Sequence, residues 1–381
     1  MSPNLLIPKW HATRRFWRSM RALTPMQTRF PTSATNTFEP IEMRAVRLHK
    51  TGDIRFEHID MVGEPGPNEV RVSVSFAGIC GSDIHNYKTG QWISRAPSIA
   101  GHEFSGVVEK TGPGVESCQV GDHIVADSRC YCSSCPNCLA GEHHLCRNLG
   151  FVGEAIDGGF AEYVILPQTL IQKCGQDTRL DIAALAEPLA VGLHALSRLQ
   201  LDAGQPLLIL GCGPIGALAA IACAVTSDRP LLVSDMNAER QTRVARCAKA
   251  RPVTLNEFDQ VDNPTGQVVR HVLDTTGNPG VIAGLISKLT GSQICLVGIG
   301  AGTIELDPVE LVEKEIALLG VHAFKDELPK AVDLLAAHPD QFGALIAPFI
   351  SLEATPERYA ELANGKVSGI KTMIEIAREA R

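Results

Sequence analysis

The 381-residue sequence lacks several features that would place it in other classes of protein. No apolar run approaches the roughly 20 residues that a membrane-spanning helix needs, so we expect no membrane partner. Basic residues are not in excess, because 42 Asp and Glu against 35 Lys and Arg give a net charge of −7. That balance gives no reason to expect nucleic-acid binding. The sequence also contains no internal repeat and no low-complexity run.

The 12 cysteines lack the pattern of a secreted disulfide framework. Four of them are clustered with the spacing of metal ligands, and the others are scattered through apolar segments. In a chain of this length, such usage indicates a reducing compartment and bound metal. The length, the 45% apolar content and a mean hydropathy near zero predict a soluble globular protein of two domains.

The first 40 residues differ in charge from the rest of the chain. They hold six Lys and Arg, a single acidic residue (Glu39) and several prolines. This composition matches an organelle transit peptide, but it also suits a disordered extension ahead of a start at Met43. We favour the second interpretation, expect a cytoplasmic protein, and leave residues 1–42 out of the fold prediction.

Two short segments hold candidate ligands for a catalytic metal. Cys80 lies in Gly-Ile-Cys-Gly-Ser-Asp-Ile-His, and His102 and Glu103 follow a connector that contains glycine and proline. Thiolate, imidazole and carboxylate groups all suit Zn²⁺. Ser82 and His85 share the first segment, where they could pass on a proton. A lone cysteine or histidine is usually a core residue, so the hypothesis depends on the combination.

The most specific motif is a set of four closely spaced cysteines: Cys132, Cys135, Cys138 and Cys146. Four thiolates at this spacing can surround one tetrahedral Zn²⁺ and leave no open position, which predicts a structural site. The polar loop around them offers little apolar surface, so a metal is its natural stabiliser. We interpret the neighbouring His143 and His144 as solvated, because the four thiolates complete the shell.

Residues 205–221 have the pattern of a strand, a tight turn and a helix around Gly-x-Gly-x-x-Gly. Gly211 allows the turn, Gly213 lets the backbone approach a pyrophosphate, and Gly216 permits close packing of helix on strand. Asp235 ends the next apolar strand, close to the roughly 20-residue spacing of a ribose-binding acid. Its carboxylate would repel a 2′-phosphate, so NAD is favoured over NADP.

Short strands divided by glycine turns fill residues 43–188, including a half-buried strand predicted at Val70–Phe76. They predict an antiparallel, barrel-like domain. Later apolar segments, at 268–274 and 293–297, have the character of parallel strands that end in glycine. We expect helices at 326–337 and 356–363 and a closing strand at 369–376.

Gly78–His85 followed by GHEFSGVV at 101–108 resembles the zinc-dependent medium-chain dehydrogenase/reductase family, in its sorbitol, L-idonate and threonine dehydrogenase branch. The resemblance runs from about Met43 to the C-terminus. It implies a two-domain α/β fold: a GroES-like, partly open β-barrel catalytic domain (43–188 and 322–381) and a Rossmann doubly wound parallel sheet (189–321). It also implies NAD, two zinc ions per chain, and a homodimer or homotetramer.

The resemblance also assigns roles to individual residues. It makes Cys80, His102 and Glu103 direct ligands of the catalytic zinc. Glu187 becomes an alternate ligand or a hydrogen-bond partner of water at the metal, so either glutamate could supply the third protein ligand. The backbone of Val297–Ile299 would hold the nicotinamide carboxamide. The cofactor set is completed by the rest of the glycine motif and by neighbouring residues: Pro214, Ile215, Arg240 and Gly298.

The resulting hypothesis is the reversible oxidation of a secondary alcohol, a polyol or a sugar acid, to a ketone. Zinc would act as a Lewis acid, hydride would pass to NAD, and the proton would leave by Ser82 and the ribose to His85. Asn86 and the lack of an arginine at 321–324 argue against sorbitol itself. The alternatives are an amino-alcohol oxidation of the threonine 3-dehydrogenase type and, from another class, a dinucleotide-binding sensor that has lost catalysis.

Overall fold

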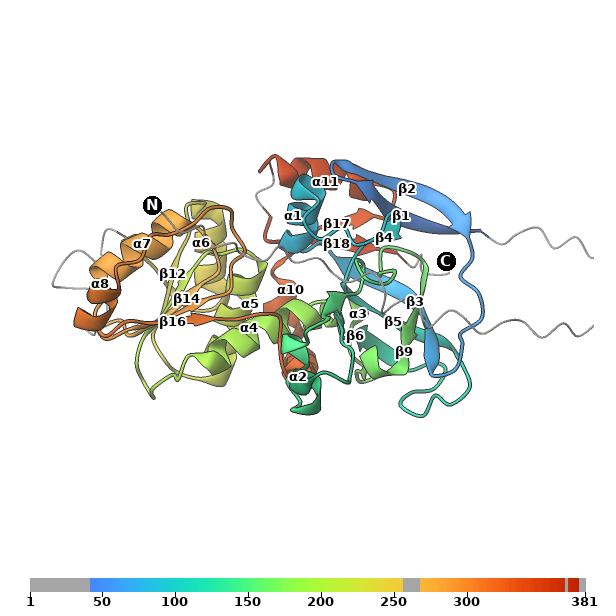
Figure 1. Ribbon diagram of the computed structural model, residues 1–381, viewed down its shortest axis with the longest axis horizontal. Helices are drawn as coiled ribbons and strands as arrows, with labels where there is room; N and C mark the ends of the chain where they lie inside the picture. Colours follow the sequence, from blue (N-terminus) through green and yellow to red (C-terminus); the bar gives the residue numbers. More distant parts are fainter. Residues whose placement is uncertain (1–41, 256–267, 367–368, 377–381) are drawn as a thin grey trace, which may run out of the picture. The chain divides into compact units, whose positions relative to one another are not determined.

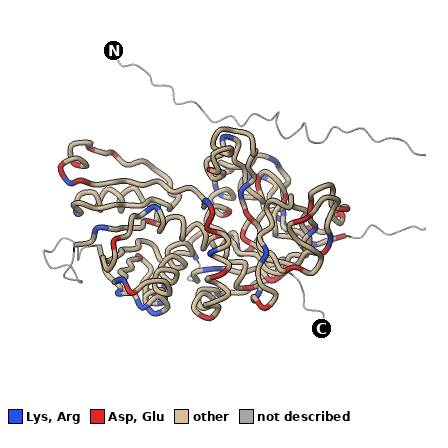
Figure 2. Tube along the Cα trace, turned by 90° about the horizontal axis from the view of Figure 1, so that it is seen from below, with Lys and Arg blue, Asp and Glu red and all other residues tan. Residues whose placement is uncertain are grey.

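The computed structural model describes residues 42–255, 268–366 and 369–376. The prediction for residues 1–42 lies outside the described residues, apart from Glu42, which begins the first strand. No helix in the described ranges is long and apolar enough to cross a bilayer. Figure 2 shows basic and acidic residues intermixed along the described chain.

The barrel-like part is built on a seven-stranded sheet in the order β10-β6-β5-β3-β18-β17, with β9 also paired to β3. All its pairs are antiparallel except β17 with β18. The strands are β3 (Glu69–Gly78), β5 (Glu103–Thr111), β6 (His123–Ala126), β9 (Tyr163–Pro167), β10 (Ile171–Lys173), β17 (Ile346–Ser351) and β18 (Lys371–Glu375).

Two small sheets complete the barrel-like part (Figure 1). The first has the order β2-β1-β4 and the second pairs β7 with β8. Their strands are β1 (Glu42–Lys50), β2 (Asp53–Asp60), β4 (Ser98–Ile99), β7 (Arg129–Cys130) and β8 (Gly150–Phe151).

The predicted half-buried strand at Val70–Phe76 is β3, but it is buried more completely than its alternating pattern indicates. It lies in the middle of the sheet, with β5, β9 and β18 as neighbours. Even Arg71 is only 9% exposed, and its guanidinium pairs with the Glu109 carboxylate at 3.0 Å. Because β3 is a central strand, both of its faces are buried. A charged side chain such as Arg71 is tolerated there because it forms an ion pair.

A six-stranded parallel sheet in the order β13-β12-β11-β14-β15-β16 follows in the chain. This is the doubly wound order in which the first strand lies at the centre. The strands are β11 (Leu207–Leu210), β12 (Leu231–Ser234), β13 (Arg251–Pro252), β14 (His271–Asp274), β15 (Gln293–Leu296) and β16 (Ala317–Gly320).

Helices cover both faces of this sheet, as the alternation of β11 requires. Leu207 and Ile209 belong to the apolar cluster that includes α4, α5 and α6, whereas Leu208 and Leu210 pack into the cluster of α7. The fold class predicted from the sequence is therefore confirmed (Figure 1). The helices are α4 (Ala186–Arg198), α5 (Pro214–Thr226), α6 (Ala238–Cys247), α7 (Pro279–Lys288) and α8 (Pro308–Glu313).

After β16 the chain returns to the barrel-like part, where β18 pairs with β3. The predicted C-terminal helices and closing strand are present within a few residues of their expected bounds, as α9, α11 and β18. The remaining elements are α1 (Gly81–Thr89), α2 (Pro136–Leu139), α3 (Leu180–Ala183), α9 (Leu328–Ala337), α10 (Pro339–Gly343), α11 (Thr355–Ala363) and the 3₁₀ turns η2 (His143–Leu145) and η3 (Gln168–Leu170).

A buried arginine fastens β7 to this returning segment. Arg129 donates from Nη1 to the carbonyl oxygens of Phe324 at 2.5 Å and Lys325 at 2.7 Å. Its other side pairs with the Asp127 carboxylate at 2.7 Å, and its guanidinium lies 4.1 Å from the centre of the Phe324 ring. The crossing point between the two parts is thus held by backbone carbonyls and a fully engaged charge.

Candidate metal centres and cofactor site

Cys80 is positioned by the start of helix α1. The strand β3 ends at Gly78, and Cys80 is the N-cap residue of the helix, with an extended backbone. Asp83, in the first turn, accepts a hydrogen bond from the Cys80 backbone N–H at 2.8 Å. This reciprocal cap satisfies a backbone donor at the helix end and holds the Cys80 side chain at the mouth of the helix.

His102 and Glu103 are brought to the same place by the connection from β4 to β5. Gly101 precedes them with φ +92°, and a Cβ there would lie 2.2 Å from the Phe160 ring, so only glycine fits. Glu103 is the first residue of β5 and is paired across the sheet with Gly78, two residues before Cys80. The ligand atoms of Cys80, His102 and Glu103 lie within 4.8 Å of one another.

The His102 ring is held between two side chains of α1. Its Nδ1 lies 3.6 Å from Asp83 Oδ1, and its Nε2 lies 3.5 Å from Ser82 Oγ. Burial alone lowers the pKa of His102. The Asp83 carboxylate and the Cys80 sulfur together raise it by more than burial lowers it, so the pKa of His102 is well above its usual value. Burial also raises the pKa of the Cys80 thiol. A divalent cation among these groups would favour the thiolate and the neutral imidazole.

Glu103 has a second partner that the sequence did not indicate. Lys371, the first residue of β18, points its Nζ at Glu103 Oε2 and donates to the Ile79 carbonyl oxygen at 2.9 Å. Both side chains are 1% exposed. Gly78 makes room for the pair, because a Cβ there would lie 2.5 Å from Lys371 Cε. The buried lysine offsets one negative charge of the candidate metal site.

Glu187 lies beside this group but outside it. It is the second residue of α4, and its Oε1 accepts a hydrogen bond from Ser128 Oγ at 2.6 Å. Burial raises the pKa of Glu187 to about 7, with a smaller opposing effect of His102 and a smaller raising effect of Glu103. Among the described residues, the close ligand set contains Glu103 rather than Glu187.

His85 lies one turn further along α1, with its ring partly exposed. Its Nε2 is 2.9 Å from Gln91 Oε1, and its ring centre is 4.7 Å from that of Trp92. Ser82, on the same helix, instead approaches His102. The predicted pair Ser82 and His85 therefore shares one helix, with the serine on the metal side and the histidine toward solvent.

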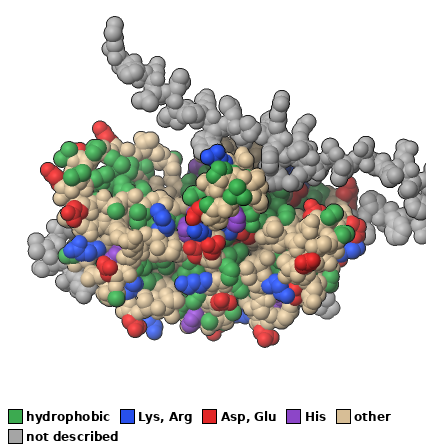
Figure 3. Space-filling view, turned by 60° about the horizontal axis from the view of Figure 1, so that its bottom comes forward, with side chains coloured by type: hydrophobic (Ala, Val, Ile, Leu, Met, Phe, Trp, Pro, Cys, Tyr) green, Lys and Arg blue, Asp and Glu red, His purple; other side chains and the backbone are tan. Residues whose placement is uncertain are grey.

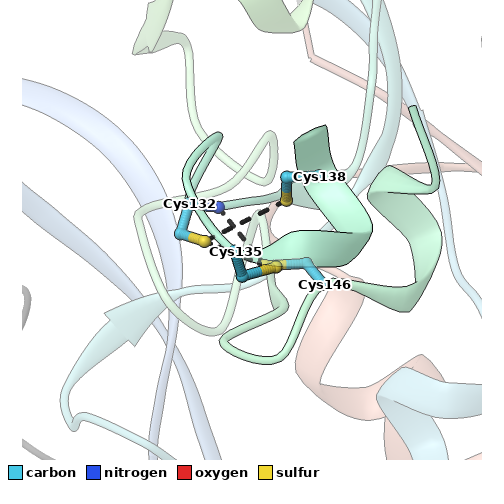
Figure 4. A group of neighbouring side chains, drawn as sticks. All are labelled: Cys132, Cys135, Cys138 and Cys146. Carbon is cyan, nitrogen blue, oxygen red and sulfur yellow. Dashed lines mark hydrogen bonds between the residues drawn. The ribbon is translucent and has the colours of Figure 1, made fainter. Parts of the chain in front are cut away.

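The four clustered cysteines lie around one point (Figure 4). Cys132 Sγ is 3.5 Å from Cys146 Sγ and 4.0 Å from Cys138 Sγ. Cys135 caps the short helix α2, which carries Cys138. With zinc–sulfur bonds of about 2.3 Å, a tetrahedral site has sulfur–sulfur edges of about 3.8 Å, so these distances fit a four-thiolate zinc centre.

Backbone N–H groups support negative charge on part of this cluster. Hydrogen bonding from Ser134 lowers the pKa of Cys132 to about 6, and hydrogen bonding from Arg147 lowers the pKa of Cys135. Burial raises the pKa of Cys138 to about 12 and also raises that of Cys146. Backbone hydrogen bonds thus favour the thiolate forms of Cys132 and Cys135, whereas Cys138 and Cys146 need a nearby cation to ionise.

The interpretation of His143 and His144 as solvated is wrong for His144. His144 is buried, and its ring meets that of His194 edge to face at 5.1 Å. His143 stacks on Tyr131 at 4.1 Å. The cysteine loop therefore packs on α4 through His144. The polar composition of the loop does not reveal that contact.

The glycine turn between β11 and α5 has the geometry that the sequence predicted. Gly211 has φ +93°, and a Cβ on Gly216 would lie 1.9 Å from the Gly211 carbonyl oxygen. A Cβ on Gly213 would meet no described atom within 4 Å. Gly213 is the N-cap of α5, with Pro214 and Ile215 in its first turn. The open space at Gly213, in front of a helix N-terminus, fits a phosphate group.

Asp235 directly follows β12 and faces this turn. Its Oδ2 accepts from the Cys212 N–H at 2.6 Å, and its Oδ1 accepts from the Asn237 N–H at 2.7 Å. Arg240 lies in the first turn of α6 and donates its backbone N–H to the Asn237 cap at 3.0 Å. The carboxylate is therefore fixed at the end of the strand neighbouring the glycine turn.

Val297–Ile299 leave β15 at the same edge of the sheet. The N–H groups of Val297 and Gly298 donate to the Asp274 carbonyl oxygen at 3.0 and 3.2 Å. A Cβ on Gly298 would lie 2.2 Å from the Gly277 nitrogen, so the turns after β14 and β15 touch backbone to backbone. Ile299 is 59% exposed. The carboxyl ends of β11, β12, β14 and β15 thus present all the predicted cofactor residues at one edge, where ligands of such sheets bind.

Sequence reasoning missed three residues of the metal site. Asp83 carried a signal, because an acid three residues after a helix N-cap is a capping-box pattern. Lys371 carried a weaker one, as one of two charged residues, with Glu375, in the segment 369–376. Ser128 has no signal of its own, since only the fold brings it to Glu187.

Comparison with known proteins agrees with this architecture. The model of the family described as "Alcohol dehydrogenase GroES-like domain" matches residues 66–176. The sorbitol dehydrogenase of Bacillus subtilis (strain 168) is 27% identical over 345 residues, which cover 88% of this chain and 98% of that protein. The L-threonine 3-dehydrogenase of Deinococcus radiodurans is 30% identical over 289 residues, 74% of this chain and 83% of that protein.

A solved structure is similar over most of the chain. The 2R,3R-butanediol dehydrogenase from Bacillus subtilis has a TM-score of 0.79 and 30% identity, and the match covers 87% of this chain and 99% of that one. Fold and site together define a two-domain α/β dehydrogenase with a GroES-like part. The chain belongs to the zinc-dependent medium-chain dehydrogenase/reductase family, in the branch of polyol and threonine dehydrogenases.

Proposed function

We propose that the chain is a zinc-dependent, NAD-linked dehydrogenase that oxidises a secondary alcohol, a polyol or a sugar acid, to the ketone. One observation carries the proposal. The thiol of Cys80, the imidazole of His102 and the carboxylate of Glu103 lie within 4.8 Å of one another in the barrel-like part. In the parallel sheet, the glycine turn after β11 has open space at Gly213. Metal ligands and a dinucleotide turn are the two parts that hydride transfer from an alcohol requires.

In this proposal Cys80, His102 and Glu103 hold the catalytic zinc, and Glu187 serves as an alternate ligand or as a partner of water at the site. Zinc bound there would supply Lewis-acid polarisation of the substrate hydroxyl. Asp83 keeps the His102 ring oriented by its contact with Nδ1. A partner of this kind fixes the tautomer of a metal-binding histidine and raises its basicity.

In this proposal the proton of the substrate hydroxyl would leave by way of Ser82 and the cofactor ribose to His85. The two residues lie three positions apart on α1, which places them on neighbouring parts of one helix surface. His85 is partly exposed and already contacts the polar Gln91 side chain. Imidazole is the side chain that commonly accepts and releases protons near neutral pH, which suits a proton shuttle.

NAD is the redox partner in this proposal. Gly211, Gly213 and the first turn of α5 hold the pyrophosphate, with Pro214, Ile215 and Gly216 shaping the turn. Asp235 binds the ribose hydroxyls, with Arg240 nearby, and the backbone of Val297, Gly298 and Ile299 holds the carboxamide. The cofactor would accept the hydride from the carbinol carbon. A second, structural zinc is held by Cys132, Cys135, Cys138 and Cys146.

The test is NADH formation from a panel of polyols, sugar acids and amino alcohols, with and without a zinc chelator. We expect oxidation of one class and its loss on chelation. Cys80→Ser should lose turnover while it still binds NADH, since the cofactor turn lies on the other sheet. Full activity of Cys80→Ser would refute the catalytic zinc. Silence of a protein that holds two zinc ions per chain would favour the sensor alternative.

A second candidate is an amino-alcohol oxidation of the threonine type. The 30% identity to an L-threonine 3-dehydrogenase favours it. The same panel separates the two, because each predicts that one class of substrate reacts with the higher kcat/KM.

We also propose a domain division and a homo-oligomeric, cytoplasmic protein. The catalytic domain would comprise residues 43–188 and 322–381, and the cofactor domain residues 189–321. A homodimer or homotetramer is supported by β16, which forms an edge of the parallel sheet among the described strands. Apolar side chains are exposed close to it in sequence, on and before α8: Leu306, Val309 and Val312.

A further inference from the structure

A glutamate outside the predicted site, Glu154, lies in a tight turn after β8. Gly153 precedes it with φ +86° and donates its N–H to the Ile156 carbonyl oxygen at 2.9 Å. The Ala155 N–H donates to the Phe151 carbonyl oxygen at 2.7 Å. These bonds fix the backbone on both sides of Glu154, so its side chain starts from a defined position.

This turn packs directly on the segment that carries the metal ligands. A Cβ on Gly153 would lie 2.9 Å from the Gly101 nitrogen, so the backbones touch one residue before His102. On its other side, Ser94 Oγ donates to the Glu154 carbonyl oxygen at 2.9 Å. Strand β7, which pairs with β8, follows Ser128, the partner of Glu187. The turn that carries Glu154 therefore lies against the His102 segment and is hydrogen-bonded to the loop before β4.

The Glu154 carboxylate makes no hydrogen bond and no ion pair within the described residues. Burial raises its pKa to about 7, His102 opposes that rise, and Asp83 adds to it. The backbone contact between Gly153 and Gly101 independently places the residue next to the segment that carries His102. A half-buried acid without a protein partner beside a reactive centre is an acceptor that a bound molecule can satisfy.

The charges nearby limit what that molecule can be. Acidic groups prevail around the site: Cys80, Asp83, Glu103, Glu154 and Glu187. Lys371 is the basic side chain that meets this group in the described chain, and Glu103 and a carbonyl oxygen already occupy it. A carboxylate on the substrate would face repulsion, whereas a hydroxyl or ammonium group would find an acceptor.

We propose that Glu154 is a specificity-determining residue that accepts a hydrogen bond from a second donor group next to the reacting carbinol, and that it excludes substrates carrying a carboxylate. This inference rests on the proposed alcohol oxidation. It narrows the substrate from polyols or sugar acids to alcohols with a neighbouring hydroxyl or ammonium group. Among the amino alcohols of the second candidate it excludes threonine itself, which carries a carboxylate.

The experiment compares four molecules of matched size with the zinc-loaded protein and NAD. They are secondary butanol, the vicinal butanediol, the matching vicinal amino alcohol and beta-hydroxybutyrate. The variants are Glu154→Gln, which keeps the shape and removes the charge, and Glu116→Gln as a control. Glu116 is exposed, and its side chain has no bond in the described chain. The readout is the ratio of kcat/KM for each molecule to that for secondary butanol.

We expect Glu154→Gln to lower the diol ratio by about tenfold and the amino-alcohol ratio by up to about a hundredfold, since a hydrogen bond to a charged acceptor is the stronger one. The carboxylate substrate should gain relative to butanol, and Glu116→Gln should change nothing. The natural donor is the one whose molecule has the higher kcat/KM ratio to butanol in wild type and loses that advantage in Glu154→Gln. Ratios that stay within about twofold of wild type would overturn the inference.

The failure of this inference can be told apart from that of the proposed function. If wild type oxidises none of the four molecules, the affinities of butanediol and butanol for the protein–NADH complex are measured by calorimetry. A diol preference that disappears in Glu154→Gln would uphold the role of Glu154 while the proposed reaction fails. Equal affinities, or no binding at all, would overturn this inference as well.

Discussion

At the residue scale, the buried ion pair of Glu103 and Lys371 is a point where a single substitution should strongly affect stability. Two ions that leave water lose several kcal/mol each, and they recover it only when both partners are present. Both side chains are 1% exposed, and Gly78 leaves space for them. The pair is therefore sensitive to the loss of either member.

Lys371→Met is expected to lower the free energy of unfolding by about 3–5 kcal/mol, because Glu103 stays buried without its cation. Glu103→Gln/Lys371→Met should regain most of that loss, since no charge is left unpaired. Denaturant unfolding of the zinc-free wild type and both zinc-free variants checks this, because Glu103 is also a proposed zinc ligand. A double variant as unstable as the single one would show that packing, not charge, is responsible.

Glu327 gives the clearest pH dependence. It is partly buried, and although burial favours its neutral form, the hydrogen bond with His194 Nδ1 at 2.8 Å prevails and lowers its pKa from 4.5 to about 2. A carboxyl whose folded pKa is depressed stabilises the fold above its unfolded pKa. That contribution is lost as the pH falls from 4.5 toward 2.

Glu327→Gln should therefore cost about 1–3 kcal/mol of unfolding free energy near neutral pH. The difference from wild type should shrink as the pH falls below 4.5. Unfolding curves at a series of pH values measure it. A difference that is the same at every pH would mean that the charge of Glu327 contributes nothing.

At the scale of elements, the glycine turn joins helix α5 to strand β11 at a separation that allows no side chain. A Cβ on Gly216 would lie 1.9 Å from the Gly211 carbonyl oxygen, which is backbone and cannot move aside. Gly284, in α7, offers a matched comparison, because a Cβ there would meet no described atom within 4 Å.

Gly216→Ala is expected to destabilise the protein by about 1–3 kcal/mol and to weaken NAD binding, because the turn and the helix N-terminus must separate. Gly284→Ala should be neutral or stabilising by up to about 1 kcal/mol, since alanine favours the helix. Thermal unfolding and NADH titration distinguish the two. Equal effects of both substitutions would contradict the close-packing argument.

The elements were easier to predict than the contacts between them. Glycine turns and apolar runs gave β5, β6, β11 and α5 to within a few residues, because local patterns carry that information. The burial of β3 on both faces and the packing of His144 on α4 depend on which segments lie next to them. In the candidate metal site, Cys80, His102 and Glu103 lie in short motifs, whereas Lys371 comes from a distant segment that periodicity cannot connect.

At the scale of the whole molecule, the family, the fold class and the dehydrogenase class expected from the motifs are confirmed by the comparisons. The surface adds a feature that the motifs do not describe. Figure 3 shows apolar side chains on the end of the molecule that carries α7 and α8. Val309 is 59% and Val312 76% exposed on α8, which buries none of its residues. Exposed apolar groups beside an open strand edge favour association between copies.

In the proposed homo-oligomer, Val312→Asp is expected to shift the protein toward the monomer, because a charge at an apolar contact must lose its water on association. Val120→Asp is the control, since Val120 is 61% exposed in a loop of the barrel-like part. Sedimentation of the wild type and both variants measures the mass. An unchanged assembly in Val312→Asp, or equal dissociation of the two variants, would place the interface elsewhere.

The pairing of Glu103 with Lys371 has a consequence for biosynthesis. The two residues are 268 positions apart. A ribosome that has released the Cys80, His102 and Glu103 segments must therefore translate the whole parallel sheet before the compensating lysine emerges. Because β18 is the strand that brings Lys371 to β3, Glu103 has no buried cationic partner from the protein until the C-terminal part of the chain has been made. The candidate metal site thus gains its compensating charge late in translation, long after its candidate ligands have been made.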